Sequence, residues 1–416
     1  MLLSDIDPRR VLLPVSIGTG LSLLGDTTLY TVLPTHTAEA GVLLASVGIL
    51  LSANRWIRLP LNSLAGWLFE RLPRRPIFVA ATLLGAVTTG MYALDAGFWN
   101  LLAARILWGL AWIGIWIGGT TLVFDVTDET NRGRWIGVYQ VSFFIGAGAG
   151  SFAGGLLTDL LGYHAAMGVN AVLQLAGALY AWVRLPETRA HAASKALVEQ
   201  QALAASADPP SGNRLELASA IALLAANRLV QEGFLLASLA LYLESLFGGT
   251  TAIGPLSIGT ATVTGASLGL TTLVAAAAAP LSGALSDRRR YRWSIAAIGL
   301  LPGALGFAAL QLGTPGWVVL GLVGTSIASG GSTNIATSLI GDLGVRSRQG
   351  RRLGGLFTIG DFASAIGPIL VFQLHPAIGL AGLYWISAGI FGLMGAVAFV
   401  WGWSKSRENR LSPINN

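Results

Sequence analysis

The chain has 416 residues, of which 53% are hydrophobic and only 11% are charged, compared with about 25% charged residues in soluble domains. This composition leaves too little polar surface for a soluble globular protein. The chain contains no cysteine, which excludes disulfides, thiol catalysis and cysteine-based metal sites. The formal charge is +6, but the basic residues form short clusters between apolar stretches, which argues against a nucleic-acid-binding surface.

A membrane-spanning helix needs about 20 predominantly apolar residues. Twelve stretches of the chain meet this requirement, and we predict that each forms one span. They are Val11–Pro34, Ala40–Phe69, Ile77–Leu94, Trp99–Phe124, Ile136–Leu160, Ala165–Leu185, Leu215–Leu246, Ile258–Leu285, Trp293–Leu312, Trp317–Ile340, Leu353–Leu374 and Leu380–Trp403. The first stretch is too long for the apolar part of a signal peptide, so we interpret it as a retained span.

The apolar pattern stops between Pro186 and Asn213, where charged residues and prolines gather. We interpret this segment as a cytoplasmic linker. The expected architecture is an all-α membrane protein with twelve transmembrane helices in two pseudo-symmetric bundles. Residues 1–185 form the first six-helix bundle, residues 186–214 the linker, and residues 215–416 the second bundle with a short cytoplasmic tail.

The basic residues predict the orientation of the chain through the positive-inside rule. Of the 26 lysines and arginines, 22 lie in the termini, the linker or the connections on the side of both termini, and the opposite connections carry none. We therefore expect a multi-pass protein of the cytoplasmic (inner) membrane with both termini in the cytoplasm. The four remaining basic residues lie inside spans and are Arg55, Arg58, Arg105 and Arg228.

A charged loop occurs after the second span of each half. The first copy begins at Gly66 and reads Gly-Trp-Leu-Phe-Glu-Arg-Leu-Pro-Arg-Arg, and the second begins at Gly283 and reads Gly-Ala-Leu-Ser-Asp-Arg-Arg-Arg. With six spans on each side of a linker, this loop resembles the Gly-x-x-x-Asp-Arg-x-Gly-Arg-Arg signature of the major facilitator superfamily of secondary transporters. Glu70 stands in place of the usual aspartate, and Pro73 in place of the second glycine.

The resemblance implies a substrate cavity near the membrane midplane between two bundles. It also implies that the loop closes the cytoplasmic side, because its acid engages the start of span eleven near Arg351–Gly355. A helix N-terminus favours an anion by about 0.3–1 kcal/mol. The gating candidates are Gly66, Glu70, Arg71, Arg74, Arg75, Gly283, Asp287 and Arg288. The alternative is that these arginines only fix the topology.

Two further motifs support the resemblance. Arg105 and Gly109 in span four match the family's Arg-x-x-x-Gly motif. Gly146, Gly150, Gly154 and Gly155 in span five are similar to the Gly-x-x-x-Gly-Pro-x-x-Gly-Gly motif of exporters, with Ser151 in the place of the proline.

Charged residues inside the membrane are costly and are by default functional. Asp26 lies about 22 Å from the cytoplasmic side of span one, and Arg105 about 9 Å from the opposite side of span four, at 1.5 Å per residue. Since the apolar core is about 30 Å thick, the two depths agree. We predict that Asp26 carries the proton and that Arg105 is its counter-charge. The alternative is a static buried ion pair.

Two further acids are candidates for proton coupling. Asp361 lies near mid-depth in span eleven, in a stretch rich in glycine that ends at Pro368. Glu232 lies in span seven, four residues after Arg228, so the two side chains share a helix face. The alternatives are a helix–helix hydrogen bond for Asp361 and mutual neutralisation for Glu232 and Arg228.

Polar and aromatic residues in the spans are candidates for substrate binding. The residues selected are Arg58, Arg105, Arg228, Tyr30, Gln140 and Asn54, and the arginines would favour an anionic substrate. A second group could contact an organic ligand but is more often found in helix packing, and consists of Trp108, Trp112, Trp116, Tyr139 and Tyr242.

No histidine has metal-ligand spacing, and no nucleotide-binding loop or nucleophile motif occurs, so we expect no enzyme, no cofactor and no metal. The favoured function is proton-coupled export of a small organic molecule by alternating access. The alternatives are proton-coupled uptake of an organic anion and lipid flipping on the same scaffold. The expected partners are a small-molecule substrate, protons and the lipid bilayer, with no nucleic acid, and the expected oligomeric state is a monomer.

Overall fold

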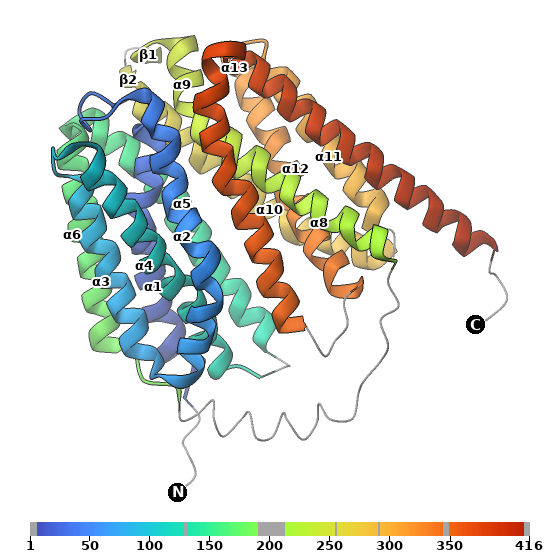
Figure 1. The fold of residues 1–416 in the computed structure, drawn as a ribbon, viewed down its shortest axis with the longest axis horizontal. Coiled ribbons are helices and arrows are strands. Elements are labelled where there is room, and N and C mark those ends of the chain that lie inside the picture. Colours follow the sequence, from blue (N-terminus) through green and yellow to red (C-terminus); the bar gives the residue numbers. More distant parts are fainter. Residues whose placement is uncertain are drawn as a thin grey trace, which may run out of the picture. The chain divides into compact units, whose positions relative to one another are not determined.

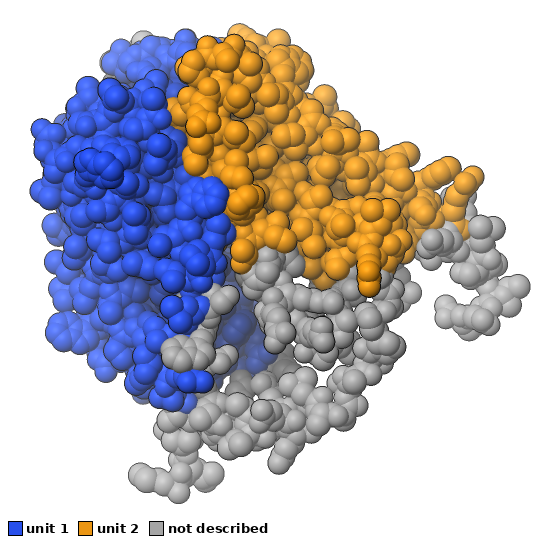
Figure 2. All heavy atoms as spheres, in the orientation of Figure 1, with its two compact units in different colours: residues 1–207, 239–269 blue, residues 208–238, 270–416 orange. Residues whose placement is uncertain are grey.

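The computed structural model describes residues 6–128, 131–189, 213–253, 256–289, 292–343 and 349–411. Its described residues are almost entirely helical (Figure 1). The chain divides into two compact units, which consist of residues 1–207 with 239–269 and of residues 208–238 with 270–416 (Figure 2). Most of the predicted linker, residues 190–212, lies outside the described part.

The first unit contains the six helices of the first half of the chain. They are α1 (Pro8–Val32), α2 (Leu44–Arg71), α3 (Arg74–Tyr92), α4 (Gly97–Asp125), α5 (Arg132–Leu161) and α6 (Tyr163–Arg184). Most of α9 (Leu236–Phe247), the strands β1 (Thr250–Ile253) and β2 (Leu256–Gly259), and the first third of α10 (Thr260–Arg289) also belong to this unit. The two strands form a short antiparallel hairpin in which Thr250 pairs with Gly259.

The second unit contains the remaining elements. They are α8 (Arg214–Arg228), the π-helix η1 (Leu229–Leu235), the rest of α10, α11 (Arg292–Leu310), α12 (Pro315–Leu343) and α13 (Gln349–Leu411). The helices α8, η1 and α9 follow one another without a break, so together they occupy the predicted seventh span. Gly379 has a φ angle of +67°, which L-residues rarely adopt, and it divides α13 into two helices.

Helices occupy all twelve predicted positions. Among the described residues, nine helical stretches are long and apolar enough to cross a membrane, and one of these, Thr358–Arg407, includes both predicted spans on either side of Gly379. The second and third predicted spans form α2 and α3, which lie outside these nine. The β1–β2 hairpin was not predicted, because its segment was assigned partly to a connection and partly to the start of span eight.

Close packing of α5 against α1 depends on glycine. A Cβ atom at Gly146 would collide with the backbone of Gly20, and one at Gly154 would collide with the side chain of Thr28. The backbones therefore approach to a distance that only small residues allow. The glycines of the exporter-like motif thus have a direct packing role in the first unit.

A second face of α5 packs against the first turn of α10. A Cβ atom at Gly155 would collide with the carbonyl of Ala261. The Asp159 Oδ2 atom accepts a hydrogen bond from the Thr262 N–H at 2.7 Å, and Gly259 leaves room for this carboxylate. Asp159 therefore satisfies one of the N–H groups that a helix N-terminus leaves without an internal partner.

Candidate functional site

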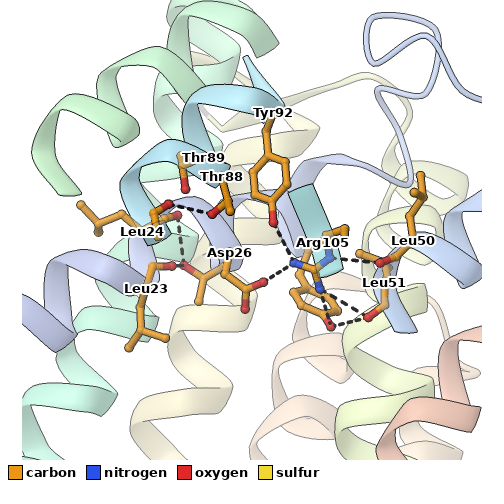
Figure 3. Close-up of polar contacts among 12 residues, drawn as sticks. Leu23, Leu24, Asp26, Leu50, Leu51, Thr88, Thr89, Tyr92 and Arg105 are labelled. Carbon is orange, nitrogen blue, oxygen red and sulfur yellow. Dashed lines mark hydrogen bonds and ion pairs between the residues drawn. The ribbon is translucent and has the colours of Figure 1, made fainter. Parts of the chain in front are cut away.

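Arg105 lies in α4, and its side chain is completely buried. Neutral oxygen atoms accept hydrogen bonds from most of its N–H groups (Figure 3). Its Nε atom donates to the Leu50 carbonyl at 3.0 Å. Its Nη2 atom donates to the Tyr30 hydroxyl at 3.2 Å and to the Leu51 carbonyl at 3.4 Å, and its Nη1 atom donates to the Tyr92 hydroxyl at 3.4 Å. The guanidinium plane is thus fixed by the backbone of α2 and by two phenol groups.

The remaining N–H group of Arg105 contacts the carboxylate of Asp26 on α1. All five N–H donors of the guanidinium are therefore in use. The Asp26 side chain is 15% exposed, whereas that of Arg105 is 0% exposed. Only Oδ1 of Asp26 faces Arg105, and Oδ2 has no hydrogen-bonding partner among the described residues. The structure thus shows that the two side chains form an ion pair.

Gly109 explains why Arg105 can reach the backbone of α2. A Cβ atom at Gly109 would collide with the Ile57 side chain and with the carbonyl of Asn54. Because glycine has no side chain, α2 packs directly on α4 one turn away from the hydrogen bonds that Arg105 donates. The Arg-x-x-x-Gly spacing therefore serves two purposes. Gly109 lets α2 pack closely on α4, and Arg105, one turn away, donates hydrogen bonds to the backbone of α2.

A polar layer extends from Asp26 into α3 and α6. The neighbouring residue Gly25 has no side chain, and a Cβ atom there would collide with Thr89 and Gln174. With its amide oxygen toward α1, Gln174 accepts from the Gly25 N–H at 2.8 Å and donates to the Gly85 carbonyl at 3.0 Å. Sequence analysis missed this layer, because uncharged polar residues in membrane helices give a weaker signal than charges.

The other predicted substrate-binding residues of the first unit lie in different surroundings. The Tyr30 ring belongs to the Arg105 network, and the Arg55 guanidinium lies 5.3 Å from its centroid. Asn54 is 3% exposed, and its Oδ1 atom has no hydrogen-bonding partner among the residues that the structure describes. Arg58 is half-buried, whereas Gln140 is exposed on α5.

The second unit holds another predicted pair. Arg228 ends α8, Glu232 lies in η1, and their side chains form an ion pair with 33% and 34% exposure. The intervening Gln231 donates from Nε2 to the Thr325 carbonyl of α12 at 2.6 Å. The pair therefore lies at the junction between an α-helix and a π-helix, a rare element that is often found at functional sites.

Asp361 belongs to the same unit as this pair. The preceding residue, Gly360, packs against Arg228, since a Cβ atom there would lie 3.6 Å from the Arg228 Cγ atom. Further along the two helices, Gly233 and Gly367 bring the backbones of η1 and α13 into direct contact. Asp361 itself is partly buried on α13. The second unit thus places Asp361 beside the helix that carries Arg228.

Two of the gating candidates make contacts within the first unit. Arg74 forms an ion pair with Asp125 at 2.6 Å, and the Arg75 Nη2 atom donates to the Trp182 carbonyl at 2.6 Å. The Glu187 carboxylate accepts from the backbone N–H groups of Arg74 and Arg75 at 3.0 and 3.1 Å. These contacts tie the start of α3 to the ends of α4 and α6.

The remaining gating candidates provide fewer contacts. Arg71 is exposed at the end of α2, and Gly283 of α10 lies against the Asn334 amide. The side chains of Glu70, Asp287 and Arg288, the surroundings of Gly66 and the side chains at the start of α13 lie outside the described part of the structure. The closing of the cytoplasmic side by this loop therefore stays a prediction.

The geometry of the Asp26–Arg105 pair suits the transfer of a proton. It combines one partly exposed carboxylate with an arginine that stays charged at all relevant pH values. No group of three or more histidine, aspartate or glutamate side chains in the described ranges could hold a metal ion. The site can bind a proton or a hydrogen-bond donor at Asp26.

Solved structures with the same fold include two membrane transporters. One is the human organic anion transporter MFSD10, which is 21% identical, with a TM-score of 0.64 and coverage of 94% of this chain and 100% of that chain. The other is a bacterial homologue of the human lysosomal transporter Spinster, which is 16% identical, with a TM-score of 0.75 and coverage of 95% and 96%. They confirm the all-α membrane fold.

Curated relatives include two tetracycline resistance proteins. The class G protein of Vibrio anguillarum is 27% identical over 389 residues, which cover 90% of this chain and 93% of that protein. The class C protein of Escherichia coli is 27% identical over 349 residues, which cover 82% and 83%. Residues 15–323 and 231–414 match the model of the protein family described as "Major Facilitator Superfamily". The chain therefore belongs to the major facilitator superfamily and is a multi-pass membrane transporter.

Proposed function

We propose that this transporter exports a small organic molecule in exchange for protons, and that Asp26 carries the proton. The observation that supports this most strongly is the asymmetry of the Asp26–Arg105 pair. The arginine is completely buried and bound by neutral oxygen atoms, while the acid retains exposure and a carboxylate oxygen without a hydrogen-bonding partner among the described residues. A transported proton needs such an acid, because it must bind and leave in each cycle.

Protonation of Asp26 leaves the charge of Arg105 without its counter-ion. In an apolar interior an unpaired charge is costly. Here the carbonyls of Leu50 and Leu51 and the hydroxyls of Tyr30 and Tyr92 continue to accept hydrogen bonds from the guanidinium. These dipoles lower the cost of the protonated state, so the carboxylate can change its charge while Arg105 stays in place.

Export is favoured over uptake of an organic anion for two reasons. The relatives with the broad coverage given above are tetracycline resistance proteins. In addition, Arg105 is paired with Asp26 and Arg228 with Glu232, so neither of these arginines offers an uncompensated positive charge to an anion. We place the protein in the cytoplasmic membrane as a monomer with both termini in the cytoplasm.

The test uses purified protein in liposomes with an imposed pH gradient. Labelled tetracycline serves as the export probe, 4-hydroxybenzoate as the organic-anion probe and a fluorescent phospholipid as the flippase probe. We expect tetracycline flux that follows the pH gradient. In Asp26→Asn this flux falls by about tenfold or more, equivalent to about 1.4 kcal/mol. Exchange of labelled for unlabelled tetracycline without a gradient is retained, because it requires no net proton transfer.

Asp95→Asn is the matched control, since Asp95 is an exposed acid in the connection between α3 and α4. It should transport as the unaltered protein does. Gradient-driven tetracycline flux that persists in Asp26→Asn would show that another group carries the proton. Transport of 4-hydroxybenzoate or lipid in place of tetracycline would support one of the two alternative functions.

A further inference from the structure

One face of α6 follows α1 past the turn that carries Asp26. Asn170, Gln174 and Gly177 are spaced four and three residues apart, so they share this face. In that order along α6, they contact Thr28, Gly25 and Leu21 of α1. Two of these contacts are hydrogen bonds made by buried amide side chains, since Asn170 is 1% exposed and Gln174 is 0% exposed. Helix α6 therefore holds this part of α1 through polar groups.

Gln174 reaches the backbone of α1 directly. Gly25 precedes Asp26 and has no side chain, so the amide oxygen of Gln174 can accept from the Gly25 N–H at 2.8 Å. The same amide donates to the Gly85 carbonyl of α3 at 3.0 Å, and both of its polar atoms lie within hydrogen-bonding distance of the Thr89 Oγ1 atom. Gln174 therefore ties the backbone of α1 to that of α3, one residue before the acid.

Asn170 holds the same turn of α1 two residues after the acid. Its Nδ2 atom donates to the Thr28 Oγ1 atom at 2.9 Å, and this hydroxyl donates to the Gly150 carbonyl of α5 at 3.1 Å. Gly25 and Thr28 are three residues apart, so they lie on one face of α1, which differs from the face of Asp26. We call Asn170 and Gln174 the amide bracket, because their contacts flank Asp26 in the sequence.

Charged and titratable groups of the first unit lie on the other side of this turn. Asp26 points toward Arg105 of α4 (Figure 3), and the hydroxyls of Tyr92 of α3 and Tyr30 of α1 accept from the same guanidinium. The Arg55 guanidinium of α2 lies beside the Tyr30 ring. The groups that α5 and α6 present to the turn are uncharged, and they are Gly150, Asn170 and Gln174. A rotation of α1 about its axis would therefore move Asp26 relative to Arg105.

We propose that Asn170 and Gln174 are positioning residues, and that the amide bracket sets how tightly Asp26 binds its proton. An acid binds a proton less tightly beside a cation than apart from one. Arg105 cannot follow a rotation of α1, because its N–H groups are bound to the backbone of α2. The contact between acid and cation therefore depends on the amides that fix the rotation of α1. This assignment rests on the proton-carrying function of Asp26 proposed above.

The test follows the protonation of Asp26 directly in purified protein. Infrared difference spectra recorded over a range of pH show a C=O band for a protonated carboxyl group, and the band missing from Asp26→Asn belongs to Asp26. Gln174→Met keeps the length of the side chain but removes both polar atoms. We expect the midpoint of the Asp26 band to move upward by about one pH unit, or tenfold tighter proton binding, because the contact with Arg105 is weakened.

Thr28→Val is a milder second variant, because valine keeps the shape of threonine and removes only the hydroxyl to which Asn170 donates. It should move the midpoint in the same direction. Gln311→Met is the matched control. The Gln311 Nε2 atom donates to the Ala381 carbonyl at 3.3 Å in the second unit, so the same change removes a hydrogen bond far along the chain from Asp26. This control should leave the midpoint unchanged.

Two results would overturn the amide bracket. One is an unchanged midpoint in folded Gln174→Met and in folded Thr28→Val. The other is an equal shift in Gln311→Met, because the shift would then report a general loosening of helix packing rather than the position of Asp26.

The spectra require no transport, so they are independent of the test of proton-coupled export. A shifted midpoint in Gln174→Met, together with an absence of gradient-driven tetracycline flux in the unaltered protein, would retain the amide bracket and remove the export function. Gradient-driven flux that requires Asp26, together with an unchanged midpoint in Gln174→Met and Thr28→Val, would retain the export function and remove the amide bracket.

Discussion

The carboxylate of Asp26 pairs with the guanidinium of Arg105, yet the acid retains 15% exposure while the arginine retains none. The Asp26 carboxylate is therefore accessible from outside the protein interior, whereas the Arg105 guanidinium is not. Arg105 is fixed by the backbone of α2 and by two tyrosines, so it acts as a permanent positive charge. In the proposed exchange, Asp26 is therefore the member that we expect to take up and release the proton.

Arg105→Lys tests whether the shape of the guanidinium matters as well as its charge. Lysine has three N–H donors where arginine has five, so at least two of the acceptors around position 105 would lose their partner. We expect the free energy of unfolding to fall by about 1–3 kcal/mol for the buried acceptors left without a donor. Thermal unfolding in detergent measures this.

Arg10→Lys is the control, because Arg10 is exposed near the start of α1. Its melting temperature should match that of the unaltered protein. A melting temperature of Arg105→Lys that also stays unchanged would show that the buried hydrogen bonds of Arg105 do not stabilise the fold.

Gly109→Ala tests the close contact between α2 and α4. The added methyl group would collide with the carbonyl of Asn54, and backbone atoms yield less readily than side chains. We expect α2 to move away from α4, with a loss of stability of about 1–3 kcal/mol and weaker hydrogen bonds from Arg105 to α2. Thermal unfolding and gradient-driven flux should both decline.

The matched control for that variant is Gly168→Ala in α6, where a Cβ atom meets nothing within 4 Å. This change should be neutral or stabilising by up to about 1 kcal/mol, because alanine favours a helix more than glycine does. Equal stability of the two alanine variants would contradict the packing role of Gly109.

Asp159→Asn tests the contact between α5 and the first turn of α10. An amide can still accept a hydrogen bond from the Thr262 N–H, but it lacks the negative charge that favours a helix N-terminus. We expect the free energy of local unfolding around the start of α10 to fall by about 0.3–1 kcal/mol. Faster hydrogen exchange of amides in β2 and in the first turn of α10 would measure this change. Asp95→Asn should leave this exchange unchanged.

The twelve helices and the Asp26–Arg105 pair could be predicted from the sequence. Apolar length determines the spans, because the bilayer has a fixed thickness. The pair was predicted because helix rise places Asp26 of span one and Arg105 of span four at the same depth. In both cases the thickness of the bilayer and the rise of the helix convert a position in the sequence into a depth in the membrane.

The partners that fix Arg105 could not be predicted. The carbonyls of Leu50 and Leu51 carry no side-chain signal, and Tyr92 lies at the end of α3, where an interfacial position is the usual reading. The rotation of each helix about its axis decides such contacts. Depth alone leaves that rotation open, which is also why Arg55 was not expected beside the Tyr30 ring.

The π-helix η1 gives the seventh span one residue more than an α-helix of the same rise would hold. It has 7 residues and carries Glu232, directly after Arg228 at the end of α8. Each residue of an α-helix turns the chain by about 100°. Loss of the surplus residue would rotate the part of the helix that follows η1 by about 100° relative to α8. Arg228 and Glu232 would remain four residues apart on one helix face, so the ion pair would be kept while the helix beyond it turns about its own axis.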